Sequence, residues 1–181
     1  GGEKNVTYRY NVFRDSQVFV IGFHIRNNSG YKIYGNVVVG GNIHGVFVSA
    51  DSAHLDVLPS SEIYNNSIIG VDVGGRGIVF TGPLTDSVGD RSYAYNNLVY
   101  DCDSPKFSGS VVSDYNSYFD CTGTIDEEPH RHVASGNPFE DIANDRFEIV
   151  MSPPSGKSDL GEPFAVDPAG NLRGVDSVWD A

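Results

Sequence analysis

Long apolar runs and an apolar N-terminal stretch are missing from this 181-residue sequence. Nowhere do about 18 apolar residues follow one another, which is the length that a membrane-spanning helix requires. The first residues, Gly1 to Lys4, also lack the apolar core of a signal peptide. We therefore expect no membrane insertion, although a signal peptide or further repeats of a longer protein could precede this start.

Basic residues are scarce, with 12 Lys and Arg against 24 Asp and Glu and a formal net charge of −12. Such a charge repels the phosphate backbone of nucleic acids and the anionic face of most membranes, so we expect neither as a partner. An acidic excess can attract Ca²⁺ or a cationic partner. It also keeps a secreted surface soluble, and we favour this second interpretation.

Apolar residues make up 39% of the chain, a little below the usual share. The chain has 21 glycines and many Asn, Asp and Ser residues, which supply turn chemistry rather than helix chemistry. The sequence therefore predicts short strands and turns without long helices. Its length suits one folding unit.

What the sequence does contain is a repeat centred on asparagine. Each copy has Tyr, Gly or Asn, then the repeat Asn, then a short β-favouring run closed by Gly or Asp. The copies are Tyr10–Asp15, Gly35–Gly40, Asn65–Gly70, Asn96–Asp101 and Tyr115–Asp120. Their irregular spacing is unsuited to a helical repeat but natural for stacked coils that carry loops of variable length.

The repeat asparagine suits a tight turn, because Asn tolerates the left-handed backbone conformation. Stacked on one another, these amides would satisfy each other's donors and acceptors as an internal ladder. The second residue after each repeat Asn is always large, which predicts one inner wall of the core. This wall would consist of Phe13, Val38, Ile68, Val99 and Tyr118.

A second element, a strand that begins with glycine, alternates with the asparagine repeat. Its copies are Gly22–Ile25, Gly45–Val48 and Gly77–Phe80. Aligned on their glycines, these segments place His24 beside Phe47 and Val79. We therefore expect His24 to be a packed or half-exposed structural residue rather than a catalytic one.

The segment Glu62–Gly70, which reads Glu-Ile-Tyr-Asn-Asn-Ser-Ile-Ile-Gly, resembles the repeats of the pectate-lyase-like superfamily. The resemblance covers about residues 5 to 124 and implies an all-β fold, a right-handed single-stranded parallel β-helix of about five coils. Such helices include lyases, hydrolases, epimerases, adhesins and phage tail proteins. The resemblance therefore implies a fold and not a reaction.

Beyond Thr124 the repeat fades into sequence that contains Pro and Asp. Residues 167–174 and the final Trp179-Asp180-Ala181 resemble the closing stretch of bacterial surface β-helix proteins. We therefore assign residues 1–124 to the coils and residues 125–181 to an irregular C-terminal segment that caps them, as a solenoid end requires.

Two insertions follow the same strand of successive coils, at Ala50–Ser60 and Gly82–Arg91. Equivalent insertions on stacked coils project from one side, where they would form a wall beside a strand face that can bind a ligand. The candidate ligand-binding residues of these loops are Asp51, Asp56, Asp86, Asp90 and Arg91.

A β-helix lyase needs a cation, usually Ca²⁺ or Arg, to neutralise a uronate carboxylate, and a base to remove the neighbouring proton. The candidate catalytic residues are His54, Asp72 and Arg76, with His54 or Arg76 as the base. The candidate Ca²⁺ ligands are Asp51, Asp56, Asp72 and Asp86. These residues suit the chemistry by type and form no motif, and solvated loops would have the same composition. The signatures of polygalacturonase-like hydrolases are absent from the sequence.

Cys102 and Cys121 each lie five residues after a repeat asparagine, on two successive coils. Stacked strands are about 4.8 Å apart, which is within the Cα separation that a disulfide accepts. A secreted location would favour oxidation. We predict a disulfide, and a buried pair of thiols is the alternative.

Two further groups of residues have a plain structural interpretation. His130 and His132 lack a third metal ligand at fixed spacing, so we expect a solvated turn there. Several tyrosines precede the repeat asparagines, and some of them must point outward. They could stack on sugar rings, but we favour aromatic side chains that cover the solenoid.

The sequence leaves two hypotheses for the function. In the first, which we favour, the chain is a non-catalytic extracellular or cell-surface β-helix module that binds glycans or serves a structural role. In the second it is a polysaccharide lyase that uses Ca²⁺ or Arg. The Asn-x-Ser/Thr sequons at Asn5, Asn27 and Asn65 fit an extracellular location, while the oligomeric state and the ligand are not indicated by any motif.

Overall fold

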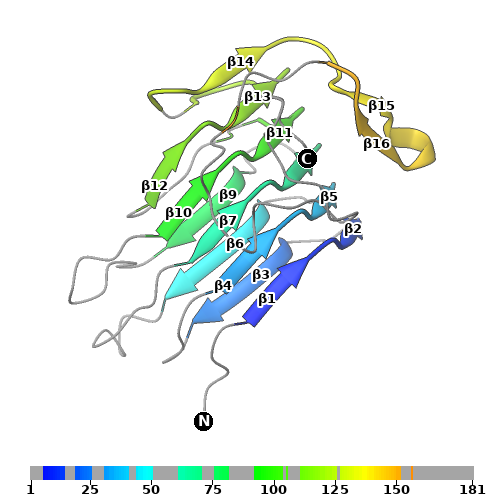
Figure 1. Cartoon of the computed structure of the whole chain (residues 1–181). Coiled ribbons are helices and arrows are strands. Elements are labelled where there is room, and N and C mark those ends of the chain that lie inside the picture. The colour runs from blue at the N-terminus through cyan, green and yellow to red at the C-terminus, as the bar shows by residue number, and fades with distance from the viewer. Residues whose placement is uncertain are drawn as a thin grey trace.

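The computed structural model describes residues 6–14, 19–25, 31–40, 44–50, 61–70, 76–81, 92–103, 105, 111–125, 127–151 and 156. Within these ranges the chain consists of β-strands and one short 3-10 turn, η2 (Ile142–Asn144). Apart from one hairpin, the strands pair in parallel and form three sheets (Figure 1). The all-β expectation is thereby confirmed, and the arrangement is compatible with a β-helix.

In the first three passes the chain visits the three sheets in turn, and in the next two passes the described strands lie in sheets A and B; each pass is one coil. Sheet A contains, in spatial order, β1 (Val6–Arg9), β4 (Tyr31–Tyr34), β7 (Glu62–Tyr64), β10 (Ser92–Tyr95) and β12 (Val111–Asp114). Sheet B contains β2 (Val12–Arg14), β5 (Val37–Val39), β8 (Ser67–Ile69), β11 (Leu98–Tyr100), β13 (Ser117–Phe119) and β14 (His132–Ala134). Sheet C contains β3 (Phe19–Ile25), β6 (His44–Ala50) and β9 (Arg76–Thr81).

The residue in the left-handed conformation is the one before each repeat asparagine and not the repeat asparagine itself, as we had expected; it separates each strand of sheet A from the repeat asparagine that precedes sheet B. The five residues at this turn position, with φ between 55° and 62°, are Tyr10, Gly35, Asn65, Asn96 and Tyr115. Glycine and asparagine accept this conformation readily. Gly35 is required for a second reason, because a Cβ there would lie 2.5 Å from the ring of Tyr10.

The predicted asparagine ladder is confirmed. Each repeat amide donates from Nδ2 to Oδ1 of the repeat asparagine in the next coil, at 3.0 Å in all four steps. The members, in order, are Asn11, Asn36, Asn66, Asn97 and Asn116. Because Asn36 to Asn116 are at most 1% exposed, the ladder satisfies polar groups that water cannot reach.

The predicted inner wall is also confirmed, because its residues pair in register across sheet B. The pairs are Phe13 with Val38, Val38 with Ile68, Ile68 with Val99, and Val99 with Tyr118. Facing them from sheet A are Ile33, Ile63 and Ala94, which are fully buried in the same cluster. Full burial of an aliphatic or aromatic side chain contributes about 1.5–3 kcal/mol, so this double wall carries most of the described core.

The glycine alignment of the second element is confirmed for Gly45–Val48 and Gly77–Phe80, where Phe47 pairs with Val79, but it was wrong by two residues for Gly22–Ile25. Gly22 pairs with Phe47, and His24 pairs with Ser49 instead of Phe47. A glycine inside a strand does not mark register by itself: β3 and β6 pair from their first residues, Phe19 and His44, and Gly22 lies two residues further into its strand than Gly45 does. The shift of two preserves the face on which each side chain lies.

The C-terminal part of the described chain adds two elements to the coils. Strand β14 pairs with β13, so sheet B continues past residue 124. After it, β15 (Phe139–Asp141) and β16 (Arg146–Ile149) form an antiparallel hairpin. Phe139 is buried against Ile69, Leu98 and Phe119, which alternate with the wall residues and therefore lie on the outer face of sheet B. The hairpin covers that face (Figure 1).

Candidate functional site

Most of the predicted site lies outside the described residues. This is so for Asp51, His54, Asp56, Asp72, Asp86, Asp90 and Arg91, and also for the C-terminal motifs at residues 167–174 and 179–181. Arg76 is the first residue of β9, where it pairs with His44. The strands that lead into the two insertions do lie side by side, since Val48 pairs with Phe80. The proposed loop wall and its Ca²⁺ ligands stay a prediction.

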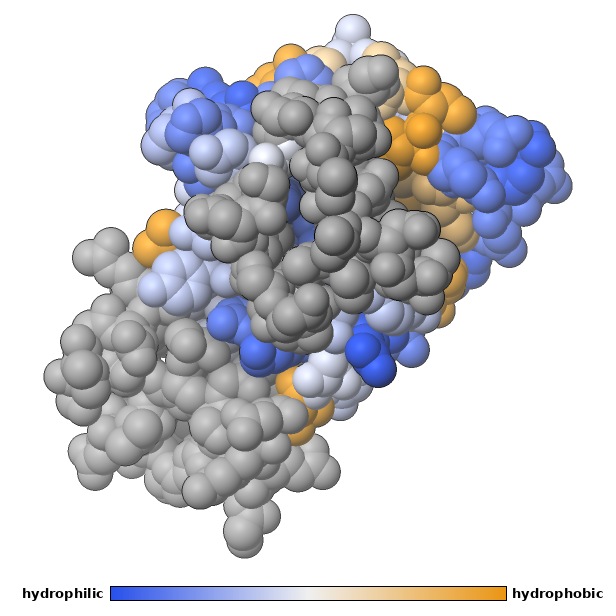
Figure 2. All heavy atoms as spheres, viewed as in Figure 1, coloured by the Kyte–Doolittle hydropathy of each residue, from blue (hydrophilic) through white to orange (hydrophobic). Residues whose placement is uncertain are grey.

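The described part of the chain does contain a groove of about 480 Å³, between the hairpin and the first coils. Tyr10, Asn11 and Asn65 line it from the turns, and Phe147 and Glu148 line it from β16. Figure 2 shows the hairpin as a largely hydrophilic lobe with hydrophobic surface beside it. Two aromatic rings, three amides and two carboxylates, those of Asp145 and Glu148, thus border one groove.

Asn65 is the most unusual of these residues. Its side chain is 2% exposed, and neither Oδ1 nor Nδ2 has a hydrogen-bond partner. An unpaired buried polar atom costs about 1–3 kcal/mol, so a hydroxyl group that reached this amide from the groove would recover part of that cost. The burial also means that the sequon at Asn65 offers no surface attachment point for a glycan in the folded chain, while Asn5 and Asn27 lie outside the described residues.

The charges beside the groove are mainly acidic. Arg14 forms an ion pair with Asp145 and lies 5.7 Å from the centre of the Phe147 ring. This pairing neutralises Asp145, whereas Glu148 is exposed at the rim. A uronate carboxylate would meet a like charge here, and a neutral sugar would not.

The outward tyrosines of sheet A are packed side chains, as we expected. Tyr34 and Tyr64 pair in register and are buried, at 2% and 6% exposed. Tyr64 stacks on Tyr95, with ring centres 5.5 Å apart, and burial raises the pKa of its hydroxyl. Tyr10 meets Tyr34 edge to face and also lines the groove.

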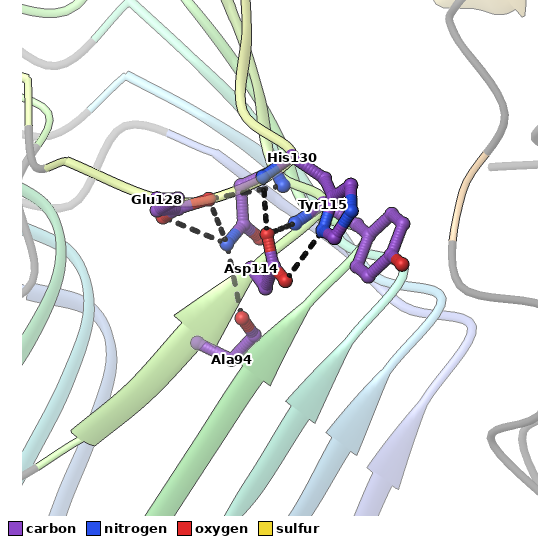
Figure 3. A network of polar contacts seen from close by, with 6 residues as sticks. Ala94, Asp114, Tyr115, Glu128 and His130 are labelled. Atoms are coloured by element: carbon purple, nitrogen blue, oxygen red, sulfur yellow. Dashed lines mark hydrogen bonds and ion pairs between the residues drawn. The ribbon is translucent and has the colours of Figure 1, made fainter.

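The ladder ends on Glu128, a residue that sequence reasoning did not identify. Its Oε1 accepts a hydrogen bond from the Tyr118 hydroxyl at 2.7 Å. Its Oε1 also accepts from Asn116 Nδ2 at 3.0 Å, and its Oε2 accepts the Asn116 backbone N–H at 3.2 Å (Figure 3). Every ladder amide donates toward this end, so the positive ends of the aligned dipoles face the carboxylate. Burial raises the pKa of Glu128, and the bonds from Tyr118 and Asn116 oppose that rise.

A second carboxylate fastens the same C-terminal segment. Asp114 Oδ2 lies 2.9 Å from His130 Nδ1, and Asp114 Oδ1 accepts the backbone N–H of His130 at 2.7 Å (Figure 3). The His130 ring stacks on Tyr115, with ring centres 4.3 Å apart. No serine or cysteine is among the described partners of this pair, which suits a structural latch better than a nucleophilic site.

The expected solvated turn is confirmed at His130, whose side chain is 56% exposed. His132 packs edge to face on Phe119 instead of facing His130. Among the residues that the structure describes, no three His, Cys, Asp or Glu side chains are grouped so that they could hold a metal ion.

Asp114→Asn should lower the free energy of unfolding by about 1 kcal/mol at neutral pH. Burial acts to raise the pKa of Asp114, but the hydrogen bonds from His130 and Tyr115 outweigh it and the pKa is lowered. The stabilisation is therefore present above the usual pKa of 3.8 and is lost as the pH falls through the lowered value. Urea unfolding at pH 7 and at pH 3 measures this, and an equal deficit at both values would contradict it.

Cys102 and Cys121 lie on successive coils as expected, but both are thiols in the structure. The predicted disulfide therefore stays a prediction for the oxidised chain.

No protein-family model, curated protein or solved structure matches this chain. Within the described ranges, no helix is long and apolar enough to cross a membrane.

Proposed function

We propose that this chain is a module of a right-handed parallel β-helix, of the pectate-lyase-like kind, that binds neutral glycans without cleaving them, outside the cell or at its surface. Three parallel sheets visited in turn support the β-helix. The confirmed asparagine ladder supports the resemblance in sequence, because the repeat that carries the resemblance is also the repeat that stacks.

The observation that carries the proposed activity is the unpaired amide of Asn65 in a groove bordered by aromatic rings. Sugar rings present apolar C–H faces that pack on aromatic side chains, and their hydroxyls pair with amides and carboxylates. Tyr10 and Phe147 supply the rings, and Asn11 and Asn65 supply the amides. The Glu148 carboxylate makes a neutral glycan a better ligand than a uronate.

Asn65→Gly should weaken glycan binding about tenfold, the equivalent of one hydrogen bond. Glycine accepts the φ of 55° at this position and removes two unpaired buried atoms, so the melting temperature should not fall. Binding is measured by calorimetry on panels of neutral and uronic-acid oligosaccharides, with and without Ca²⁺. Absorbance from new unsaturated ends is followed in the same samples.

Asn96→Gly is the matched control, because Asn96 has the same backbone conformation one coil further on and does not line the groove. It should leave binding unchanged. Failure of every glycan to bind would contradict the proposal. Release of unsaturated ends from a uronate polymer, lost on changing Asp72 or Arg76 to alanine, would make the chain a polysaccharide lyase that uses Ca²⁺ or Arg instead.

A further inference from the structure

The two cysteines occupy equivalent places at the end of neighbouring strands in sheet B. Cys102 follows β11 and Cys121 follows β13, and the backbone N–H of Thr122 donates to the Cys102 carbonyl at 3.0 Å, which fixes the two segments side by side. The left-handed residues Asp101 and Asp120 precede them in both coils. Cys121 packs against the core cluster that contains Cys102, and its Sγ lies 3.5 Å from the carbonyl oxygen of Val99, which belongs to the coil of Cys102.

The two thiols differ in their exposure and in their surroundings. Cys102 is 2% exposed and packs in the core cluster with Val99 and Tyr118, whereas Cys121 is only partly buried. The hydrogen bond from Cys102 lowers the pKa of Cys121, and burial opposes this. A thiolate is the attacking form in disulfide exchange. Cys121 is therefore the residue that meets an oxidant first.

We propose that Cys102 and Cys121 are an oxidation site, at which a small disulfide oxidant converts the two thiols into a bridge that fastens the coil of β12 and β13 to the coil of β10 and β11. The site is independent of glycan binding, since neither cysteine lines the groove. The oxidation site lies at the end of the stack of coils where the asparagine ladder stops.

The reaction takes place in two exchange steps. The Cys121 thiolate attacks one sulfur of the oxidant, forms a mixed disulfide and releases the other half of the oxidant as a thiolate. Cys102 then loses its proton to water and attacks the Cys121 sulfur, which releases the second half. Two electrons and two protons leave the cysteines, and the oxidant becomes two thiols.

The bridge would close a loop that contains the residues which hold the C-terminal segment. Asp114, Asn116 and Tyr118 all lie between the two cysteines, and they bind His130 and Glu128. Closing a loop removes conformational freedom from the unfolded chain. The oxidised protein should therefore melt about 5 °C above the reduced protein.

The test uses hydroxyethyl disulfide, because an uncharged oxidant is not repelled by the nearby Asp101, Asp103 and Asp120. The reduced 181-residue chain is incubated with it, and mass spectrometry follows the products. We expect a monomer lighter by two hydrogen atoms and the rise in melting temperature. Cys102→Ser should stop at the mixed disulfide of Cys121, and Cys121→Ser should react about tenfold more slowly, because Cys102 is buried.

Both serine variants are first compared with the reduced chain by circular dichroism and melting, so that a folding defect is recognised before oxidation. Three results would overturn the proposal. The first is a mixed disulfide that persists in the unaltered chain, the second is a bridge between two chains, and the third is an internal bridge without a change in melting temperature.

Discussion

Glu128→Ala should lower the free energy of unfolding by about 3 kcal/mol, because it leaves buried donors without an acceptor. The Asn116 backbone N–H and the Tyr118 hydroxyl would both lose their bonds to the carboxylate. Asn116 Nδ2 would keep its bond to the Ala94 carbonyl at 2.9 Å, which limits the loss. Urea unfolding followed by circular dichroism measures the change.

Glu128→Gln is the matched control for this substitution. The amide oxygen can still accept from Tyr118, but the amide NH₂ would face the Asn116 N–H, which is also a donor. We expect a loss of about 1–2 kcal/mol, between that of alanine and none. If alanine and glutamine were equally harmful, the charge rather than the acceptor geometry would be what stabilises this end of the ladder.

The same comparison has a pH dependence of known sign. Burial raises the folded-state pKa of Glu128 above its usual 4.5. The stabilisation that this shift gives the folded chain is therefore fully present below pH 4.5 and is lost as the pH rises through the raised pKa. Glutamine does not titrate. The stability of the unaltered chain relative to Glu128→Gln should therefore fall as the pH increases from about 4 toward neutrality.

The elements that the sequence predicts well are those that repeat. The ladder and the inner wall could be predicted because each coil must place one amide and one large side chain at the same depth. Glu128 could not, because it follows the last repeat and occurs once. Hydrogen-bond accounting could have predicted such a residue, because a row of amides that all donate in one direction needs an acceptor at its end.

The repeat predicted neither the full register of sheet C nor the groove, and the reasons differ. Gly22, Gly45 and Gly77 looked equivalent, yet only Gly45 and Gly77 share a register position, because Gly22 pairs with Phe47. The groove depends on Phe147 and Glu148, which belong to a hairpin outside the repeat. The hairpin packs on the outer face of sheet B. The repeat was defined by residues of the inner face, so it does not predict where the hairpin packs.

Asn66→Ala, in the middle of the ladder, should lower the free energy of unfolding by about 4 kcal/mol. Asn66 Nδ2 donates to the Ile33 and Tyr64 carbonyls at 2.9 and 3.1 Å, and Oδ1 accepts both the N–H and the Nδ2 of Asn36. All of these groups are buried, so alanine would leave several of them unpaired with no water in reach.

Asn11→Ala makes the corresponding change at the exposed end of the ladder. Asn11 Nδ2 donates to the Arg9 carbonyl at 2.9 Å and to Asn36 Oδ1, and its side chain is exposed to water. Water can replace both bonds, so the loss should be under about 1 kcal/mol. Because the two substitutions remove the same atoms, equal losses at Asn11 and Asn66 would show that burial of the amides contributes nothing beyond local turn preference. A loss at least threefold larger at Asn66 would show that the ladder stabilises the stack as a connected, water-free network.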